Sequence, residues 1–367
     1  MANSHELFMH FNGAIKLSDK DRETLKIARN SLRDRVKIAF NKLPVEDKKA
    51  HTIEFQSQGS FVMDTIIKPK QEDDFDLDDG IYFQGGLPEE KRAETQVFHN
   101  LIIKAIDRQN EIEDIEDKST CVRVKYYIPN GEERGFHIDL PIYYAENLDT
   151  PELADTKNGW TESSPVEFIA WFEEKTKSEF KKAFLLEALE YAEPYEKWLS
   201  DARRKDCQLR RIVRYLKVWA NLKNKDMPSG IMMSIMAANN FVETVRDDIS
   251  LRDTLVRISN ELKANGCKCF RPTPKKDEDL FAAYSNAEKE YFQKSLDSFI
   301  ISANQAIENP SKKQSCLKWQ LHLGNRFPCH LAKDEIEGAK VYATAPIKND
   351  NSRSAENVRK GCKTNSF

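Results

Sequence analysis

The segment Asp76 to Phe83 carries two aspartates, Asp76 and Asp78, in a stretch that otherwise has the composition of a β-strand. Side chains at positions i and i+2 of a strand point to one face, so these two carboxylates project together. Carboxylates that close repel each other unless a cation lies between them. Mg²⁺ is the natural ion, because it prefers hard oxygen ligands and is often shared with substrate phosphates. Asp79 points to the opposite face, where we expect it to cap or orient the turn at Gly80.

Two further stretches extend this pattern. Gln58-Gly59-Ser60 indicates a tight turn that opens a helix, in which Gly59 lets the backbone approach a phosphate and Ser60 offers a hydroxyl and an N–H group. The segment Arg134 to Tyr144 alternates apolar and polar residues, as a strand does, and carries a third acid, Asp139. His137 shares a face with Asp139, and a packing or hydrogen-bonding role is favoured for it over metal binding.

A Gly-Ser turn, an Asp-x-Asp strand and a third aspartate on another strand match the layout of polymerase-beta-type nucleotidyltransferases. The sequences of the three stretches resemble those of the cGAS/DncV-like nucleotidyltransferases, bacterial enzymes that make cyclic oligonucleotide signals in anti-phage (CBASS) defence. The resemblance runs from about Lys16 to Pro328. It implies an α+β fold with two lobes: a catalytic lobe built on a mixed β-sheet and a helical C-terminal lobe.

We expect residues 1–160 to form the catalytic lobe, 161–340 the helical lobe and 341–367 a flexible tail. With 57 Lys and Arg against 60 Asp and Glu, the net charge of −3 gives no overall attraction to nucleic acid or to anionic membranes. No run of about 18 apolar residues predicts a membrane span. The seven cysteines lack framework or zinc-type spacing, which favours reduced thiols and a cytoplasmic location. A site built from Cys316, Cys329 and His330 stays open in principle.

The pattern along the chain predicts a capped helix over 19–41, with Ser18 as N-cap and Asp21 as its capping-box partner. Residues 51–58 are predicted as a strand, 88–109 as a helix with Val97 on its buried stripe, 111–117 as a solvated acidic loop and 148–165 as loop. Strands over 121–128 and 136–144 are joined by the turn signal Pro129-Asn130-Gly131. Helices are predicted over 165–192, 203–222, 229–241, 246–264, 280–308 and 311–323.

The helix around residues 209–219 is unusually basic. Its apolar stripe consists of Ile212, Leu216 and Trp219, and its other faces carry Arg210, Arg211, Arg214 and Lys217. Spacing alone gives even odds to a solvated basic face. The resemblance implies that Lys217 meets the donor triphosphate and that Ser229, in the following Pro-Ser turn, also contacts phosphate.

The resulting hypothesis is metal-assisted nucleotidyl transfer, with Asp76, Asp78 and Asp139 holding Mg²⁺ or Mn²⁺ and with Gln58, Gly59, Ser60, Lys217 and Ser229 binding nucleotide. The resemblance implies ATP, GTP or other nucleoside triphosphates as substrates and a cyclic di- or trinucleotide as product. A linear product or another acceptor on the same scaffold is the alternative, and a nucleotide-binding scaffold without activity is a third. Some relatives are conjugated through their C-terminus by a ubiquitin-ligase-like partner, with which an exposed Phe367 is compatible. A large nucleic-acid partner is not expected.

Overall fold

The computed structural model describes residues 1–44, 51–68, 74–106, 111–127, 135–146, 150–176, 206–223 and 227–334. Residues from Met1 to Ala332 form one compact unit. Predictions for the turn at 129–131, for the end of the 165–192 helix and for the C-terminal tail lie outside the described residues. None of the described helices is both long enough and apolar enough to cross a lipid bilayer.

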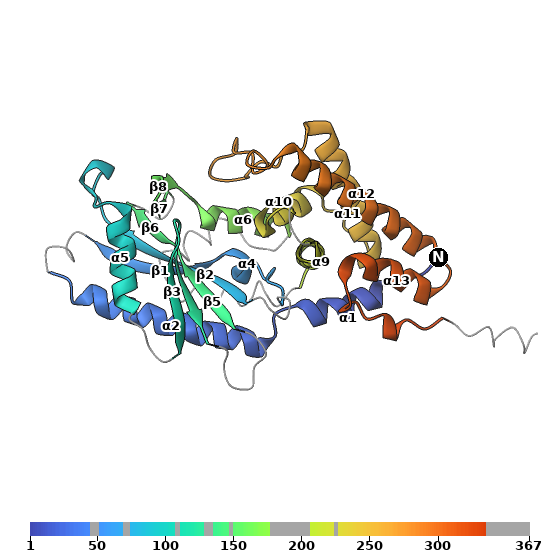
Figure 1. Ribbon diagram of the computed structural model, residues 1–367, viewed down its shortest axis with the longest axis horizontal. Coiled ribbons are helices and arrows are strands. Elements are labelled where there is room, and N and C mark those ends of the chain that lie inside the picture. The colour runs from blue at the N-terminus through green and yellow to red at the C-terminus, as the bar shows by residue number, and fades with distance from the viewer. Residues whose placement is uncertain are drawn as a thin grey trace, which may run out of the picture. The chain divides into compact units, whose positions relative to one another are not determined.

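An eight-stranded mixed sheet forms one part of this unit (Figure 1). The strands are β1 (Thr52–Gln58), β2 (Phe75–Gln84), β3 (Ile112–Asp117), β4 (Val122–Tyr126), β5 (Phe136–Leu140), β6 (Ile142–Ala145), β7 (Glu152–Asp155) and β8 (Gly159–Glu162). Their order is β3-β4-β5-β2-β6-β7-β8, and β1 pairs with β2. Only the pairs of β2 with β5 and β6 are parallel. The predicted α+β fold with a mixed sheet is therefore confirmed.

Strand β2 is the centre of the sheet. It pairs along its length with β1, from Gln84 opposite Thr52 to Asp78 opposite Gln58. Its other edge pairs first with β5 and then with β6. The predicted strand 136–144 is interrupted at Pro141, which has no N–H group for the ladder, although its carbonyl still accepts a hydrogen bond from Ile81 at 2.9 Å.

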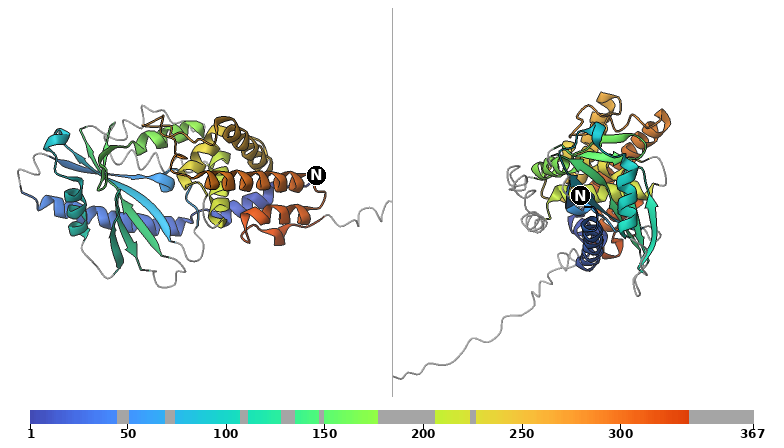
Figure 2. Two further views of the ribbon diagram at one scale, coloured as in Figure 1. Left: turned by 45° about the horizontal axis from the view of Figure 1, so that its top comes forward. Right: turned by 90° about the vertical axis from the view of Figure 1, so that its left-hand side faces the viewer.

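Two helices, α2 (Asp19–Asn41) and α5 (Thr95–Ile106), pack against the sheet. The long helix α2 runs along it in Figures 1 and 2. The predicted capping box is confirmed, since the Ser18 side chain accepts from the Asp21 N–H and the Asp21 side chain accepts from the Ser18 N–H. The apolar side chains of α2 and α5 share one hydrophobic core with those of β2 to β6.

A second hydrophobic core is built almost wholly from helices. The segment Gly59–Val62, labelled α4, contributes only its last residue, Val62, to this core. The helices are α1 (His5–Ile15), α6 (Pro165–Lys175), α9 (Gln208–Leu222), α10 (Gly230–Asn240), α11 (Asp247–Asn265), α12 (Asn286–Glu308) and α13 (Lys312–Leu323). A short 3-10 turn, Cys329–Leu331, follows α13, and another, Glu89–Lys91, lies between β2 and α5. The predicted lobe boundaries at 160 and 340 stay a prediction.

Three local predictions are wrong. The helix predicted from residue 88 begins at Thr95, after a single 3-10 turn, and Val97 is 55% exposed while Phe98 takes the buried position. Residues 112–117 form strand β3 rather than a loop, because their acidic side chains face basic side chains on β4. Residues 152–162 form a hairpin, whose turn is held by the Asp155 carboxylate accepting from the N–H groups of Lys157 and Asn158.

The expectation that all cysteines are reduced is also wrong for one pair. Cys316 of α13 and Cys329 form a disulfide bond with a Cα–Cα distance of 5.5 Å. The turn after α13 brings the chain back across that helix, a proximity that a separation of 13 residues does not reveal. The pairing also removes both thiols from the metal site considered with His330.

Buried charges tie the helical core to the segment that follows α4. Asp64 is 1% exposed and pairs with Arg214 of α9 at 2.9 Å, with Arg22 of α2 at 2.5 Å and with Lys16 at 3.3 Å. Burial alone would raise the pKa of Asp64, but the charges of Arg214, Arg22 and Lys16 outweigh it and lower the pKa. The ionised carboxylate is therefore the form that the fold stabilises.

We predict that Asp64→Asn lowers the free energy of unfolding by about 3–5 kcal/mol, because Arg214, which is fully buried, loses a compensating charge. Since the native pKa of Asp64 is lowered, its contribution is present at neutral pH and is lost as pH falls through that pKa. Urea unfolding at a series of pH values measures this. The gap between wild type and variant should narrow below about pH 4; a gap that stays constant to pH 3 would contradict the assignment. The exposed Asp277→Asn is the control.

Candidate active site

The turn between β1 and α4 brings backbone against an acid of β2. Gly59 has φ +67°, a conformation that favours glycine, and a Cβ at this position would lie 2.1 Å from Oδ2 of Asp78. The Ser60 carbonyl is fixed by hydrogen bonds from the N–H groups of Thr65 and Ile66, at 2.9 and 3.1 Å. The turn 58–60 therefore presents its backbone and the Ser60 hydroxyl beside the Asp78 carboxylate.

The pairing of β2 with β5 brings the three predicted acids together. Asp78 lies opposite Asp139 and Asp76 lies opposite His137 in the parallel register. Asp76, His137 and Asp139 each offer a ligand atom within 4.8 Å of the others. Asp79 points to the other face, as predicted, but it does not cap a turn. It is buried and binds Arg33 of α2 at 2.6 and 2.8 Å.

Strand β4 places two basic residues beside these acids. Arg123 lies opposite Asp139, and Lys125 lies opposite His137. The Arg123 guanidinium donates two hydrogen bonds of 2.7 Å to the two oxygens of Asp139, the bidentate geometry that fixes a carboxylate most firmly. This hydrogen bonding raises the pKa of Arg123 above its ordinary value. Asp139 is thus held in one orientation.

The pKa of Asp78 is raised well above the ordinary range of an aspartate. Burial is the largest cause, and the negative charges of Asp76 and Asp139 add to it, against smaller opposing effects of Lys217 and Arg123. A carboxylate in this position gains from any cation placed beside it. The oxygen donors of Asp76, Asp78 and Asp139 suit a divalent ion such as Mg²⁺ or Mn²⁺.

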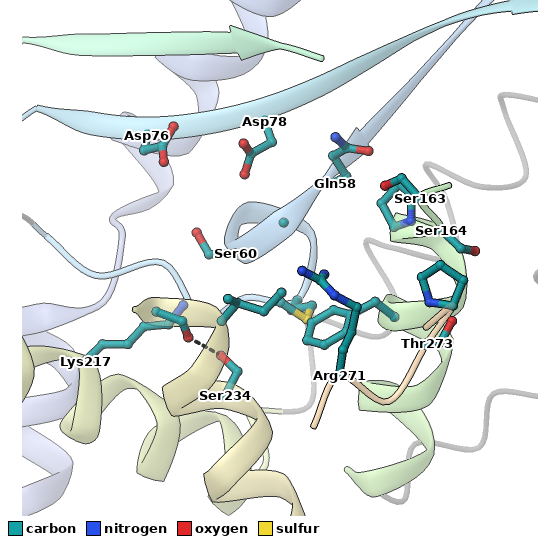
Figure 3. Close-up of a pocket in the computed structure, with 17 residues that line it drawn as sticks. Gln58, Ser60, Asp76, Asp78, Ser163, Ser164, Lys217, Ser234, Arg271 and Thr273 are labelled. Atoms are coloured by element: carbon teal, nitrogen blue, oxygen red, sulfur yellow. Dashed lines mark hydrogen bonds between the residues drawn. The ribbon is translucent and has the colours of Figure 1, made fainter. Parts of the chain in front are cut away.

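A cavity of about 400 Å³ opens beside Asp76 and Asp78 (Figure 3). The turn 58–60 and strand β2 form one wall, and the first residues of α6 and α10 form others. Lys217 of α9 reaches it from the helical core, and Arg271 enters from the segment between α11 and α12. The cavity thus combines carboxylates, hydroxyls and cations. Its lining is Gln58, Gly59, Ser60, Met63, Asp76, Asp78, Ser163, Ser164, Pro165, Phe168, Lys217, Gly230, Ile231, Ser234, Arg271, Thr273 and Pro274.

The basic residues of α9 are not a solvated face. Arg210, Arg214 and Lys217 are at most 9% exposed, because each bonds the segment that follows the turn 58–60. Their side chains donate to three successive carbonyls, in the order Arg210 to Met63 at 3.0 Å, Arg214 to Asp64 at 3.0 Å and Lys217 to Thr65 at 3.2 Å. One face of α9 therefore sets the position of this segment.

Lys217 is the basic residue of this face that lines the cavity. Burial lowers the pKa of its ammonium group to about 8, with Arg214 acting in the same direction and Asp78 opposing it. At neutral pH the Lys217 side chain is therefore mostly protonated and supplies positive charge at the wall of the cavity.

Six of the eight predicted site residues line the cavity, namely Gln58, Gly59, Ser60, Asp76, Asp78 and Lys217. Asp139 is not part of this lining; it lies opposite Asp78 and belongs to the cluster with Asp76 and His137. Ser229 is exposed at the N-cap of α10, next to Gly230, and Ser234 one turn later lines the cavity instead. No spacing pattern predicts Ser163, Ser164, Arg271 or Thr273 at this site, because they come from two segments that lie far apart in the chain.

Comparisons with known proteins agree with this geometry. Residues 53–143 match the family described as cyclic GMP-AMP synthase DncV-like, nucleotidyltransferase domain. The chain is 25% identical over 223 residues to a cyclic GMP-AMP synthase of Escherichia albertii, covering 58% of this chain and 42% of that protein. It is 26% identical over 218 residues to a c-di-GMP synthase of Roseivirga ehrenbergii, covering 58% and 54%. It therefore spans about half the length of these two relatives.

The fold is shared with a solved structure. Vibrio cholerae DncV cyclic AMP-GMP synthase, in complex with the linear intermediate 5′ pppA(3′,5′)pG, superposes with a TM-score of 0.68. The sequences are 17% identical, and the match covers 89% of this chain and 96% of that one. At this identity the likeness shows the common fold.

We predict that Gly59→Ala weakens binding of a non-hydrolysable nucleoside triphosphate by at least about tenfold. An alanine would pay about 1–2 kcal/mol for the left-handed backbone and would also displace the Asp78 carboxylate. Isothermal titration calorimetry measures the affinity. Gly13→Ala is the matched control, since a Cβ at Gly13 of α1 meets no atom within 4 Å. Equal affinities for wild type and Gly59→Ala would show that the turn does not hold the triphosphate.

Proposed function

We propose that this chain is a cyclic oligonucleotide synthase acting in anti-phage signalling, because residues 53–143 match the DncV-like nucleotidyltransferase domain family. It joins ribonucleoside triphosphates into a cyclic di- or trinucleotide and releases pyrophosphate. The observation that carries the proposal is that Asp78, which lies opposite Asp139 on paired strands, stands beside the turn 58–60 in one wall of the cavity. ATP and GTP are the first substrates to test, since the relatives are a cyclic GMP-AMP synthase and a c-di-GMP synthase.

In this proposal, Asp76, Asp78 and Asp139 hold the divalent cation. When bound, such an ion lowers the pKa of an attacking hydroxyl and offsets charge on the phosphates. The raised pKa of Asp78 and the closely grouped ligand atoms of Asp76 and Asp139 support this fit. Mg²⁺ and Mn²⁺ both suit the oxygen donors.

The remaining residues bind and orient the substrate. The backbone of Gly59 and the Ser60 hydroxyl hold the terminal phosphates of the donor nucleotide, and the Lys217 ammonium group offsets their charge. Gln58 donates to the Tyr143 hydroxyl at 3.0 Å, which fixes the side chain at the wall of the cavity. Arg123 keeps the Asp139 carboxylate in the orientation that its role requires.

We predict that the purified chain converts a mixture of the four ribonucleoside triphosphates, with Mg²⁺ or Mn²⁺, into a phosphatase-resistant cyclic product. Asp78→Asn should lower the rate at least a hundredfold, a loss of about 3 kcal/mol of transition-state stabilisation, because the amide keeps the shape but loses the charge. Phosphatase treatment followed by mass spectrometry identifies the product. Linear products would instead favour a synthase of linear chains or transfer to another acceptor. If wild type and Asp78→Asn both bind nucleotide and neither turns it over, the result favours a nucleotide-binding scaffold without activity.

We predict that Arg123→Lys lowers kcat about tenfold to a hundredfold and changes KM little. Lysine keeps the positive charge but cannot make the two parallel hydrogen bonds that orient Asp139, and Arg123 does not line the cavity. Steady-state kinetics of wild type, Arg123→Lys and Arg123→Gln separate orientation from charge. A rise in KM at unchanged kcat would show that Arg123 acts on substrate binding instead.

A further inference from the structure

His137 lies within the group of acids that the proposed function assigns to the metal. It stands two residues before Asp139 on β5 and directly opposite Asp76 of β2. Its Nε2 atom is 3.2 Å from Oδ1 of Asp76. Asp76, His137 and Asp139 each offer one ligand atom, and these three atoms lie within 4.8 Å of one another. Among the described residues this is the one group of three or more histidine, cysteine and acidic side chains close enough to share an ion.

The His137 Nε2 atom is shielded from solvent, and within the part of the chain that the structure describes its contact with Oδ1 of Asp76 does not have the geometry of a hydrogen bond. A shielded ring nitrogen normally has a well-aligned partner. Lys125, which lies opposite His137 on β4, does not supply one, because it binds Glu116 at 2.5 Å. The ring nitrogen thus faces the two carboxylates of Asp76 and Asp139.

Ligand spacing is compatible with a single ion between the three side chains. Oxygen and nitrogen ligands bind divalent cations at about 2.0–2.2 Å, so two ligands on opposite sides of an ion lie about 4 Å apart. A spread of at most 4.8 Å needs only a small inward rotation of one side chain. Neutral imidazole is the commonest protein ligand of transition-metal ions, whereas Mg²⁺ takes oxygen ligands almost exclusively.

We propose that His137 is a nitrogen ligand of the divalent cation held by Asp76 and Asp139, and that it makes this site favour a first-row transition cation over Mg²⁺. The inference deepens the proposed function and rests on it for the site's purpose. It adds a ligand that the three acids do not supply, and it concerns which ion the chain selects.

The test uses the full chain with Mn²⁺ as the probe. Electron paramagnetic resonance of unbound Mn²⁺ gives the affinity, and Mg²⁺ competition gives the selectivity. Electron spin-echo envelope modulation detects a nitrogen nucleus bound to Mn²⁺, and labelling histidine with ¹⁵N changes that signal in the wild-type protein. His137→Asn replaces the nitrogen ligand by an amide oxygen, and the exposed His10→Asn is the matched control.

The wild type and His10→Asn should both show the nitrogen modulation. In His137→Asn it should disappear while Mn²⁺ binding weakens at least about tenfold, since removal of mere outer-shell partners already costs tenfold or more. Affinity for Mg²⁺ should fall less, so the selectivity ratio should shift towards Mg²⁺. Absence of nitrogen modulation in wild type with bound Mn²⁺, or its persistence in His137→Asn, overturns the proposal. Should His137→Asn fail to fold, the ¹⁵N-histidine comparison in wild type still decides whether a histidine binds the ion.

The product assay separates this inference from the proposed function. If bound Mn²⁺ shows nitrogen coupling but no nucleotide product forms, the synthase proposal is contradicted while His137 is supported as a ligand. A cyclic product made by a protein whose bound Mn²⁺ shows no nitrogen coupling would do the reverse.

Discussion

The parallel pairing of β2 with β5 creates a concentration of negative charge around which the site is built. It sets Asp78 directly beside Asp139, and Asp76 lies on the same face of the same strand. Burial of the Asp78 carboxylate, and next the like charges of Asp76 and Asp139, raise the free energy of its ionised state and so raise its pKa. The protein offsets part of the repulsion with Arg123, whose fork binds Asp139. The rest is left for a cation to offset.

The second fixed relation is between the turn 58–60 and helix α9. Positions 210, 214 and 217 recur at three- and four-residue steps, and so lie on one face of a helix. Each donates to one of three successive carbonyls from Met63 to Thr65. The segment that leaves the turn 58–60 is thereby held against the helix that carries Lys217. The Lys217 ammonium group at the cavity wall and the turn 58–60 are therefore positioned by the same contacts, so a shift of one would disturb the other.

The sequence was sufficient where the signal is local. Strand-like composition predicted β2, alternation predicted β5, the Ser18 cap predicted the start of α2, and the three acids were grouped from motif layout. It failed where the deciding partner is distant. The acids of β3 suggested a loop because Lys125, which binds Glu116, belongs to the neighbouring strand. Spacing left a solvated basic face on α9 at even odds, because the partners of these cations lie about 150 positions earlier. Arg271 enters the cavity from a segment with no motif at all.

Strand β3, which was predicted as a loop, also affects the charges near the site. Across the sheet, one row runs Glu116, Arg123, Asp139 and Asp78, so that acidic and basic residues alternate until two acids meet. Glu116 binds Lys125 and Lys118, and these hydrogen bonds lower the pKa of Glu116 to about 2. Lys125 lies opposite His137 in register, and its ammonium group binds Glu116 of β3. The acidic edge strand thus engages the basic residue that is paired with the Asp76 and His137 end of the cluster.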